Sequence, residues 1–149
     1  MNHDEEYPAE YLANILRSVK TIAMVGASND PTKFSYGVLR VLHETGYDMV
    51  PVNPREAGGE IRGLPVVAQL KDIDRPVDMV EVFRSSSVAY AVAEEAIEIG
   101  AKVLWMQIGV RNDEAAALAE AAGLKVVMNR CPKIELFRPF WKPKLNQQI

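Results

Sequence analysis

The sequence predicts an α/β domain built on a doubly wound, mainly parallel five-stranded sheet in the order 3-2-1-4-5, with helices on both faces. Five apolar runs are nearly continuous rather than alternating, which is typical of strands buried on both faces. Gly46, Gly100 and Gly123 each precede such a run and follow a segment of helical spacing, where a left-handed residue ends a helix. The expected strands are residues 21–25, 49–52, 77–83, 103–108 and 124–128. Right-handed crossovers then favour this strand order.

Four segments outside these runs carry apolar residues at helical spacing. The first, about residues 8–19, places Leu12, Ile15 and Val19 on one face and has Pro8 at a suitable starting position. Polar residues suited to helix caps precede the other three: Ser35, then Ser85 or Ser86, then Asn112. The connection 55–76 has no such spacing and predicts a loop with a short "LPVV" element and one helical turn.

The length of 149 residues suits a single domain spanning 1–149. No composition change marks a boundary inside it. From about residue 133 to residue 149, prolines and aromatic residues predict a tail that lies on the surface or against a partner, including a second copy in a homodimer.

Charge and cysteine content restrict the compartment and the partners. The net charge of -3 gives no reason to expect nucleic-acid binding. Cys131 is the only cysteine, so no disulfide can form within the chain and a reducing cytoplasm is expected. The acidic N-terminus differs from a signal peptide, and no apolar run approaches the roughly 20 residues that cross a bilayer. We therefore expect a cytoplasmic protein that binds neither nucleic acid nor membrane.

A cation follows each expected strand. In parallel sheets the ligand lies beyond the C-terminal strand ends, so these side chains are expected at the binding edge. The residues before the strands carry mixed charges, which makes the cationic excess specific to one edge. The five cations are Lys33, Arg55, Arg84, Arg111 and Arg130. The sequence therefore predicts a site for an anion, with a solvated basic rim as the alternative.

The loop after the first strand, "GASNDPTKFS", has features of a phosphate site. Gly26 permits a tight turn, Ser28 offers a hydroxyl, Lys33 adds a charge, and Ser35 lies at an expected helix start. The simpler interpretation is that Gly26 only makes the turn and Ser35 only caps the helix. The full dinucleotide fingerprint G-x-G-x-x-G is absent, and Arg55 stands near where an acidic residue would bind a ribose. An NADP-linked oxidoreductase therefore remains an alternative.

Several motifs together resemble the CoA-binding domain family, small Rossmann-like proteins similar to the N-terminal domain of the succinyl-CoA synthetase α subunit. They are "VGAS" with "DPTKFSYGV", "VPVNP", "VDMVEVFR", "EEAIEIGAKVLWMQIGV" and "NRCPKIE", between Lys20 and Glu135. The resemblance implies coenzyme A or an acyl-CoA as the ligand. The ligand-binding residues it implies are Gly26, Ala27, Ser28, Lys33, Ser35, Val52, Asn53, Pro54, Arg55, Phe83 and Arg84.

The sequence supplies little for catalysis. The phosphorylated histidine of the related ligases belongs to a separate domain, and this chain has only His3 and His43. Two separated histidines and one cysteine do not form a metal site. Cys131 follows the last strand, where its thiol faces CoA or is simply a small buried apolar group. We expect a non-catalytic or regulatory CoA-binding protein.

Overall fold

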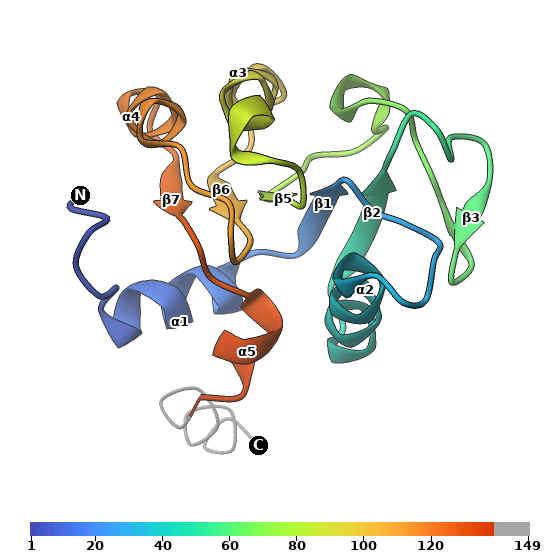
Figure 1. Cartoon of the computed structure of the whole chain (residues 1–149), viewed down its shortest axis with the longest axis horizontal. Helices are drawn as coiled ribbons and strands as arrows, with labels where there is room; N and C mark the ends of the chain where they lie inside the picture. Colours follow the sequence, from blue (N-terminus) through green and yellow to red (C-terminus); the bar gives the residue numbers. More distant parts are fainter. Residues whose placement is uncertain (139–149) are drawn as a thin grey trace.

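The computed structural model describes residues 1–138 and places a parallel five-stranded sheet between two layers of helices (Figure 1). In chain order the elements are α1 (Ala9–Ser18), β1 (Thr21–Val25), α2 (Phe34–Thr45), β2 (Asp48–Val52), β3 (Glu60–Ile61), β4 (Leu64–Pro65), the 3₁₀ turn η1 (Leu70–Asp72), β5 (Met79–Val82), the 3₁₀ turn η2 (Ser86–Val88), α3 (Ala89–Glu98), β6 (Val103–Met106), α4 (Asp113–Ala121), β7 (Lys125–Val127) and α5 (Pro132–Leu136). The doubly wound α/β class predicted from the sequence is confirmed.

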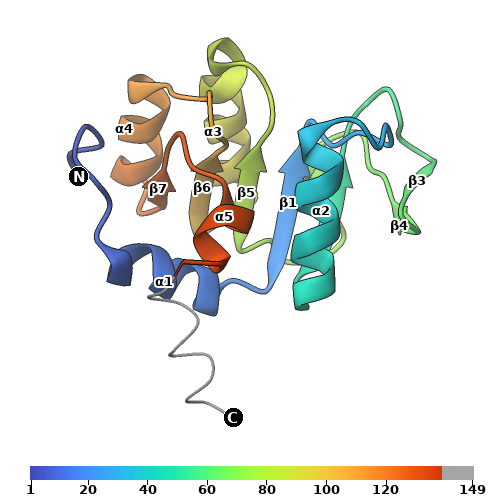
Figure 2. The same ribbon diagram turned by 60° about the horizontal axis from the view of Figure 1, so that its bottom comes forward.

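Helices α1, α2 and α5 cover one face of the sheet, and α3 and α4 cover the other (Figure 1, Figure 2). Successive strand side chains point to opposite faces, so Ile22 and Met24 pack in the first layer and Ala23 and Val25 in the second. Burial on both faces explains why the strands are almost continuously apolar.

The order of the strands differs from the prediction. Counting only the five parallel strands, the sheet has the order 2-1-3-4-5 (β2-β1-β5-β6-β7), not 3-2-1-4-5. β5 therefore pairs with β1 instead of lying at the edge beyond β2. The Asp78 carboxylate, just before β5, accepts hydrogen bonds from the backbone N–H groups of Lys20 and Thr21 at 2.9 and 3.0 Å. Both orders allow right-handed crossovers, so handedness does not distinguish them.

Two of the expected helix caps are wrong. α2 begins at Phe34 with Lys33 at the N-cap, so Ser35 lies inside the first turn, and the Ser85 and Ser86 side chains cap neither η2 nor α3. Asn112 does cap α4, accepting a hydrogen bond from the Ala115 N–H at 2.9 Å. The connection after β2 forms the β3–β4 hairpin and η1.

The expected surface tail begins instead as a helix. Residues 132–136 form α5, which has Pro132 in its first turn and buries Leu136 against α1 and α2. A proline suits this position because the first helical N–H groups need no partner within the helix. The expected partner contacts of residues 139–149 lie outside the described residues.

A carboxylate is buried in the layer formed by α1, α2 and α5. Glu81 is fully inaccessible, and strand alternation places it on the same face as Met79. Its neighbours across the sheet are Met24 and Trp105. Among the described residues, neither carboxylate oxygen has a hydrogen-bond partner. Desolvation alone raises the pKa of Glu81 to about 8.

Candidate functional site

The topological switch point of the sheet lies between β1 and β5, where the chain leaves the two strands toward opposite faces. Gly26 follows β1 with φ +91°, and a Cβ atom there would lie 2.5 Å from the Phe83 carbonyl oxygen. The Gly26 N–H donates to the Val52 carbonyl at 3.0 Å. Glycine is therefore required, because the first loop runs in close contact with the ends of both neighbouring strands.

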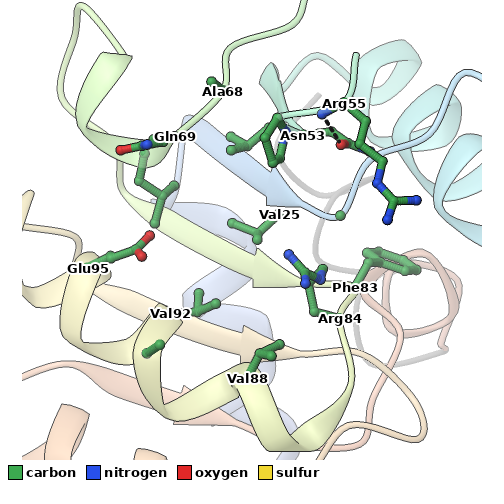
Figure 3. A pocket seen from close by; sticks show the side chains of 15 residues that line it. Val25, Asn53, Arg55, Ala68, Gln69, Phe83, Arg84, Val88, Val92 and Glu95 are labelled. Carbon is green, nitrogen blue, oxygen red and sulfur yellow. Dashed lines mark hydrogen bonds between the residues drawn. The ribbon is translucent and has the colours of Figure 1, made fainter. Parts of the chain in front are cut away.

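A cavity of about 660 Å³ opens at this point, above the C-terminal ends of β1, β2 and β5 (Figure 3). It extends to the segment before η1 and to the inner side of α3. Its lining residues are Val25, Gly26, Val52, Asn53, Pro54, Arg55, Ala68, Gln69, Leu70, Phe83, Arg84, Val88, Ala91, Val92 and Glu95. This volume lies within the usual range of ligand pockets.

The two ends of the cavity differ in charge. The guanidinium groups of Arg55 and Arg84 converge at one end beside the Phe83 ring, whereas the Glu95 carboxylate and the Gln69 amide lie at the other (Figure 3). Within residues 1–138, neither arginine forms an ion pair with an acidic side chain. Two unpaired guanidinium groups in a concave site favour a ligand with more than one negative charge.

Two other cations predicted at the strand ends, Arg111 and Arg130, already interact with neighbouring side chains. Arg111 forms ion pairs with Asp4 at 2.6 Å and Asp113 at 3.0 Å. The Arg130 guanidinium lies over the Tyr7 ring, 5.1 Å from its centroid. Both residues lie at the expected edge, but neither lines the cavity. Of the five cations predicted at the strand ends, Arg55 and Arg84 are the two that line this cavity.

Asn53 connects the loops that form this end of the cavity. Its Nδ2 donates to the Ala27 carbonyl at 2.8 Å, and its Oδ1 accepts from the Arg55 N–H at 2.9 Å. The half-buried side chain therefore holds the loop after β2 against the loop after β1. Asn53 lines the cavity, but these two bonds make it a positioning residue for Arg55.

The structure does not bring the rest of the predicted phosphate loop into this cavity. Ala27 is buried, and the Ser28 hydroxyl accepts a local hydrogen bond from the Asp30 N–H at 3.1 Å. The Asn29 N–H donates to the Glu56 carboxylate at 3.1 Å, so an acidic side chain occupies that donor. Ser35 is buried in the first turn of α2. Lys33 lines a second, neighbouring cavity.

Sequence reasoning missed the residues that close the cavity on its far side. Ala68, Gln69 and Leu70 belong to the irregular connection between β2 and β5. They do not directly follow any of the five expected strands, so the rule that identified the strand-end cations could not identify them. Val92 and Glu95 come from within α3, where their spacing is that of any amphipathic helix. No local pattern distinguishes these residues, because their role depends on how α3 and η1 pack over the sheet.

Catalytic and metal-binding features are few. Cys131 is buried and lines the second cavity, not the first. Residues 1–138 contain no group of three His, Cys, Asp or Glu side chains arranged to hold a metal ion. Over the same residues, no helix has the length and apolar character needed to span a membrane.

Residues 20–136 match the sequence pattern of a family described as "CoA binding domain". The chain belongs to this family. It is 40% identical to the uncharacterized protein YneT of Bacillus subtilis over 123 residues, covering 83% of this chain and 90% of that protein. It is also 37% identical to the α subunit of an ADP-forming acetate–CoA ligase II from Pyrococcus furiosus, covering 74% of this chain but 26% of the subunit.

Solved structures of similar length share the fold of this CoA-binding domain. A hypothetical protein from Pyrococcus horikoshii OT3 matches with a TM-score of 0.84 and 35% identity, over 91% of this chain and 94% of that one. A Thermus thermophilus protein, cell-free ID.343, matches with a TM-score of 0.82 and 37% identity, over 87% and 96% of the two chains.

Proposed function

We propose that the first cavity binds coenzyme A or an acyl-CoA, and that the protein is a small non-catalytic or regulatory nucleotide-binding protein. The observation that carries this proposal is the presence of two guanidinium groups, Arg55 and Arg84, that have no acidic partner within residues 1–138 and lie at the switch point of a CoA-binding domain. CoA carries a pyrophosphate and a ribose phosphate, so one ligand supplies anionic groups for both arginines.

The polarity of the cavity suggests how the nucleotide lies. The phosphates would occupy the end with Arg55 and Arg84, where the Gly26 turn, packed against the Phe83 carbonyl, forms part of the cavity lining. The adenine would lie over apolar side chains, with the Gln69 amide and Glu95 carboxylate available for its amino group. In this proposal Val52, Asn53, Pro54 and Phe83 flank the nucleotide, while Ala27, Ser28 and Ser35 shape the first loop.

The chemistry of the lining favours binding over catalysis. Arginine stays protonated and neither donates nor removes a proton at neutral pH. Among the cavity residues that the structure describes, Glu95 carries the one carboxylate, and it lies at the end opposite the arginines. Cytoplasmic localisation belongs to the same proposal, and the single cysteine supports it because no disulfide can form within the chain.

Isothermal titration calorimetry with CoA, dephospho-CoA and NADPH tests this proposal. We expect CoA to bind, and dephospho-CoA to bind more weakly because it lacks the ribose phosphate. Arg55→Ala and Arg84→Ala should each weaken CoA binding at least tenfold, because a hydrogen bond to a charged group contributes about 1.5–3 kcal/mol. Arg111→Ala is the matched control, since it removes an arginine from the same edge outside the cavity.

Two results would contradict the proposal. One is the absence of heat with CoA at millimolar concentration. The other is binding of NADPH in preference to CoA, which would support the NADP-linked oxidoreductase that Arg55 also permits at the end of β2.

A further inference from the structure

Strand β7 lies at one edge of the parallel sheet, and residues 1–8, which we call the N-terminal strap, run beside it (Figure 1, Figure 2). The Lys125 N–H donates to the Lys102 carbonyl on the side of β6 at 3.0 Å. Alternation along the strand therefore directs the backbone groups of Val126 and Met128 away from the sheet. Outward-facing backbone groups of an edge strand are a template for pairing with another strand.

Two tyrosine hydroxyls bind these outward-facing groups. The Tyr11 hydroxyl accepts a hydrogen bond from the Val126 N–H at 3.0 Å and donates one to the Val126 carbonyl at 2.9 Å. The Tyr7 hydroxyl accepts a hydrogen bond from the Met128 N–H at 2.8 Å. Burial raises the pKa of Tyr11 to about 12, so its hydroxyl keeps the proton that it donates. The two side chains therefore take the place of a sixth strand at this edge.

The N-terminal strap is held mainly by its rings. The Tyr7 ring is buried and stacks on that of Tyr11 with the centroids 5.9 Å apart, and the Tyr7 hydroxyl lies 2.7 Å from His3 Nδ1. Asp4 forms an ion pair with Arg111 at 2.6 Å, but the two side chains are 79% and 40% exposed, and such pairs contribute little. A segment with so few buried contacts opens more readily than the sheet that it covers.

We propose that the N-terminal strap is an autoinhibitory cover, and that the edge it covers pairs with β7 of a second copy of this chain when the strap is displaced. A second copy fits because an antiparallel edge complements itself: the Val126 N–H and carbonyl of each copy meet the same two groups of the other. In a pairing centred on Val126, Lys125 lies opposite Val127, so like charges do not meet. Both tyrosines precede residues 20–136, so the cover lies outside the part of the chain that matches the family pattern.

Leucine replacements remove the cover and keep apolar contacts. A leucine is too short to reach the strand edge, so Tyr7→Leu/Tyr11→Leu exposes it, whereas Tyr7→Phe/Tyr11→Phe removes the hydroxyls and leaves the rings over the edge. Tyr11→Leu alone is the milder variant, which decides the question if the leucine pair does not fold. Tyr90→Leu, at an exposed position of α3, is the control. Circular dichroism confirms folding, and light scattering and amide hydrogen exchange are measured from about 10 μM to 1 mM.

Wild type, Tyr90→Leu and the phenylalanine pair should remain monomeric, whereas both leucine variants should approach twice the monomer mass at high concentration, because an isologous contact closes at two copies. At low concentration the Val126 and Met128 amides of the leucine pair should exchange at least about tenfold faster than in wild type. Dimer formation should protect them again, while the Val127 amide, which faces β6, keeps its rate. Folded leucine variants that stay monomeric would overturn the inference, as would masses that grow beyond two copies or a wild-type protein that already dimerises through this edge.

Discussion

Replacing Glu81 with glutamine should change how the stability of the protein depends on pH. In the folded state desolvation raises the pKa of Glu81 to about 8, against 4.5 for an ordinary glutamate. The folded protein therefore holds this proton at pH values where the unfolded chain has released it. Stability from this group is fully present below about pH 4.5 and is lost as the pH rises toward 8.

The size of the effect follows from the two pKa values. Between the two pKa values, each pH unit lowers the free energy of unfolding by about 1.4 kcal/mol. The decrease levels off near pH 8, where Glu81 ionises in the folded state as well. Between pH 5 and pH 8 the free energy of unfolding of the wild-type protein should fall by roughly 3–4 kcal/mol relative to that of Glu81→Gln, which cannot titrate. The difference is large because Met24 and Trp105 flank the carboxylate and no described residue bonds to it.

Urea denaturation of both proteins from pH 5 to pH 8 measures this difference directly. Titrations of other groups are common to the two proteins and cancel. Glu98→Gln, on the exposed surface of α3, is the control for removing a carboxylate outside the core. Parallel stability curves for wild type and Glu81→Gln would refute the reasoning, because they would mean that Glu81 titrates alike in the folded and unfolded states.

Three further substitutions test the construction of the site and the fold. Gly26→Ala should destabilise the protein by roughly 1–3 kcal/mol in urea denaturation, because it strains a left-handed residue and forces a Cβ atom against the Phe83 carbonyl. Asn53→Ala should lower the free energy of unfolding by roughly 1–3 kcal/mol and weaken CoA binding in calorimetry, because the Ala27 carbonyl and the Arg55 N–H lose their partner. An unchanged affinity would exclude the positioning role of Asn53. Asn112→Ala should lower stability by about 1 kcal/mol through loss of the α4 cap, without affecting CoA binding.

The strands were predictable because parallel strands covered on both faces must be apolar throughout, and because a glycine of positive φ follows within two residues of the end of α2, α3 and α4. The order of the strands was not. Apolar runs identify a strand but carry no information about its neighbours, and the pairing of β5 with β1 joins segments more than 50 residues apart in the chain.

Part of the candidate site followed from a general property of parallel sheets. Arg55, Phe83 and Arg84 lie just after strands, so their convergence at one edge was expected. The sequence could not show which cations remain unpaired, because Arg111 is neutralised by Asp4, 107 residues away in the chain. It also could not place Lys33, which the path of the first loop directs to the second cavity.

The identity of the ligand is tested most directly by native mass spectrometry of the wild-type chain mixed with equal concentrations of CoA, NADP and ATP. We predict a mass increase of one CoA per chain, and its loss when Arg55 and Arg84 are both replaced by alanine. A spectrum that shows NADP or ATP instead of CoA, or no bound ligand at millimolar concentration, would contradict the account.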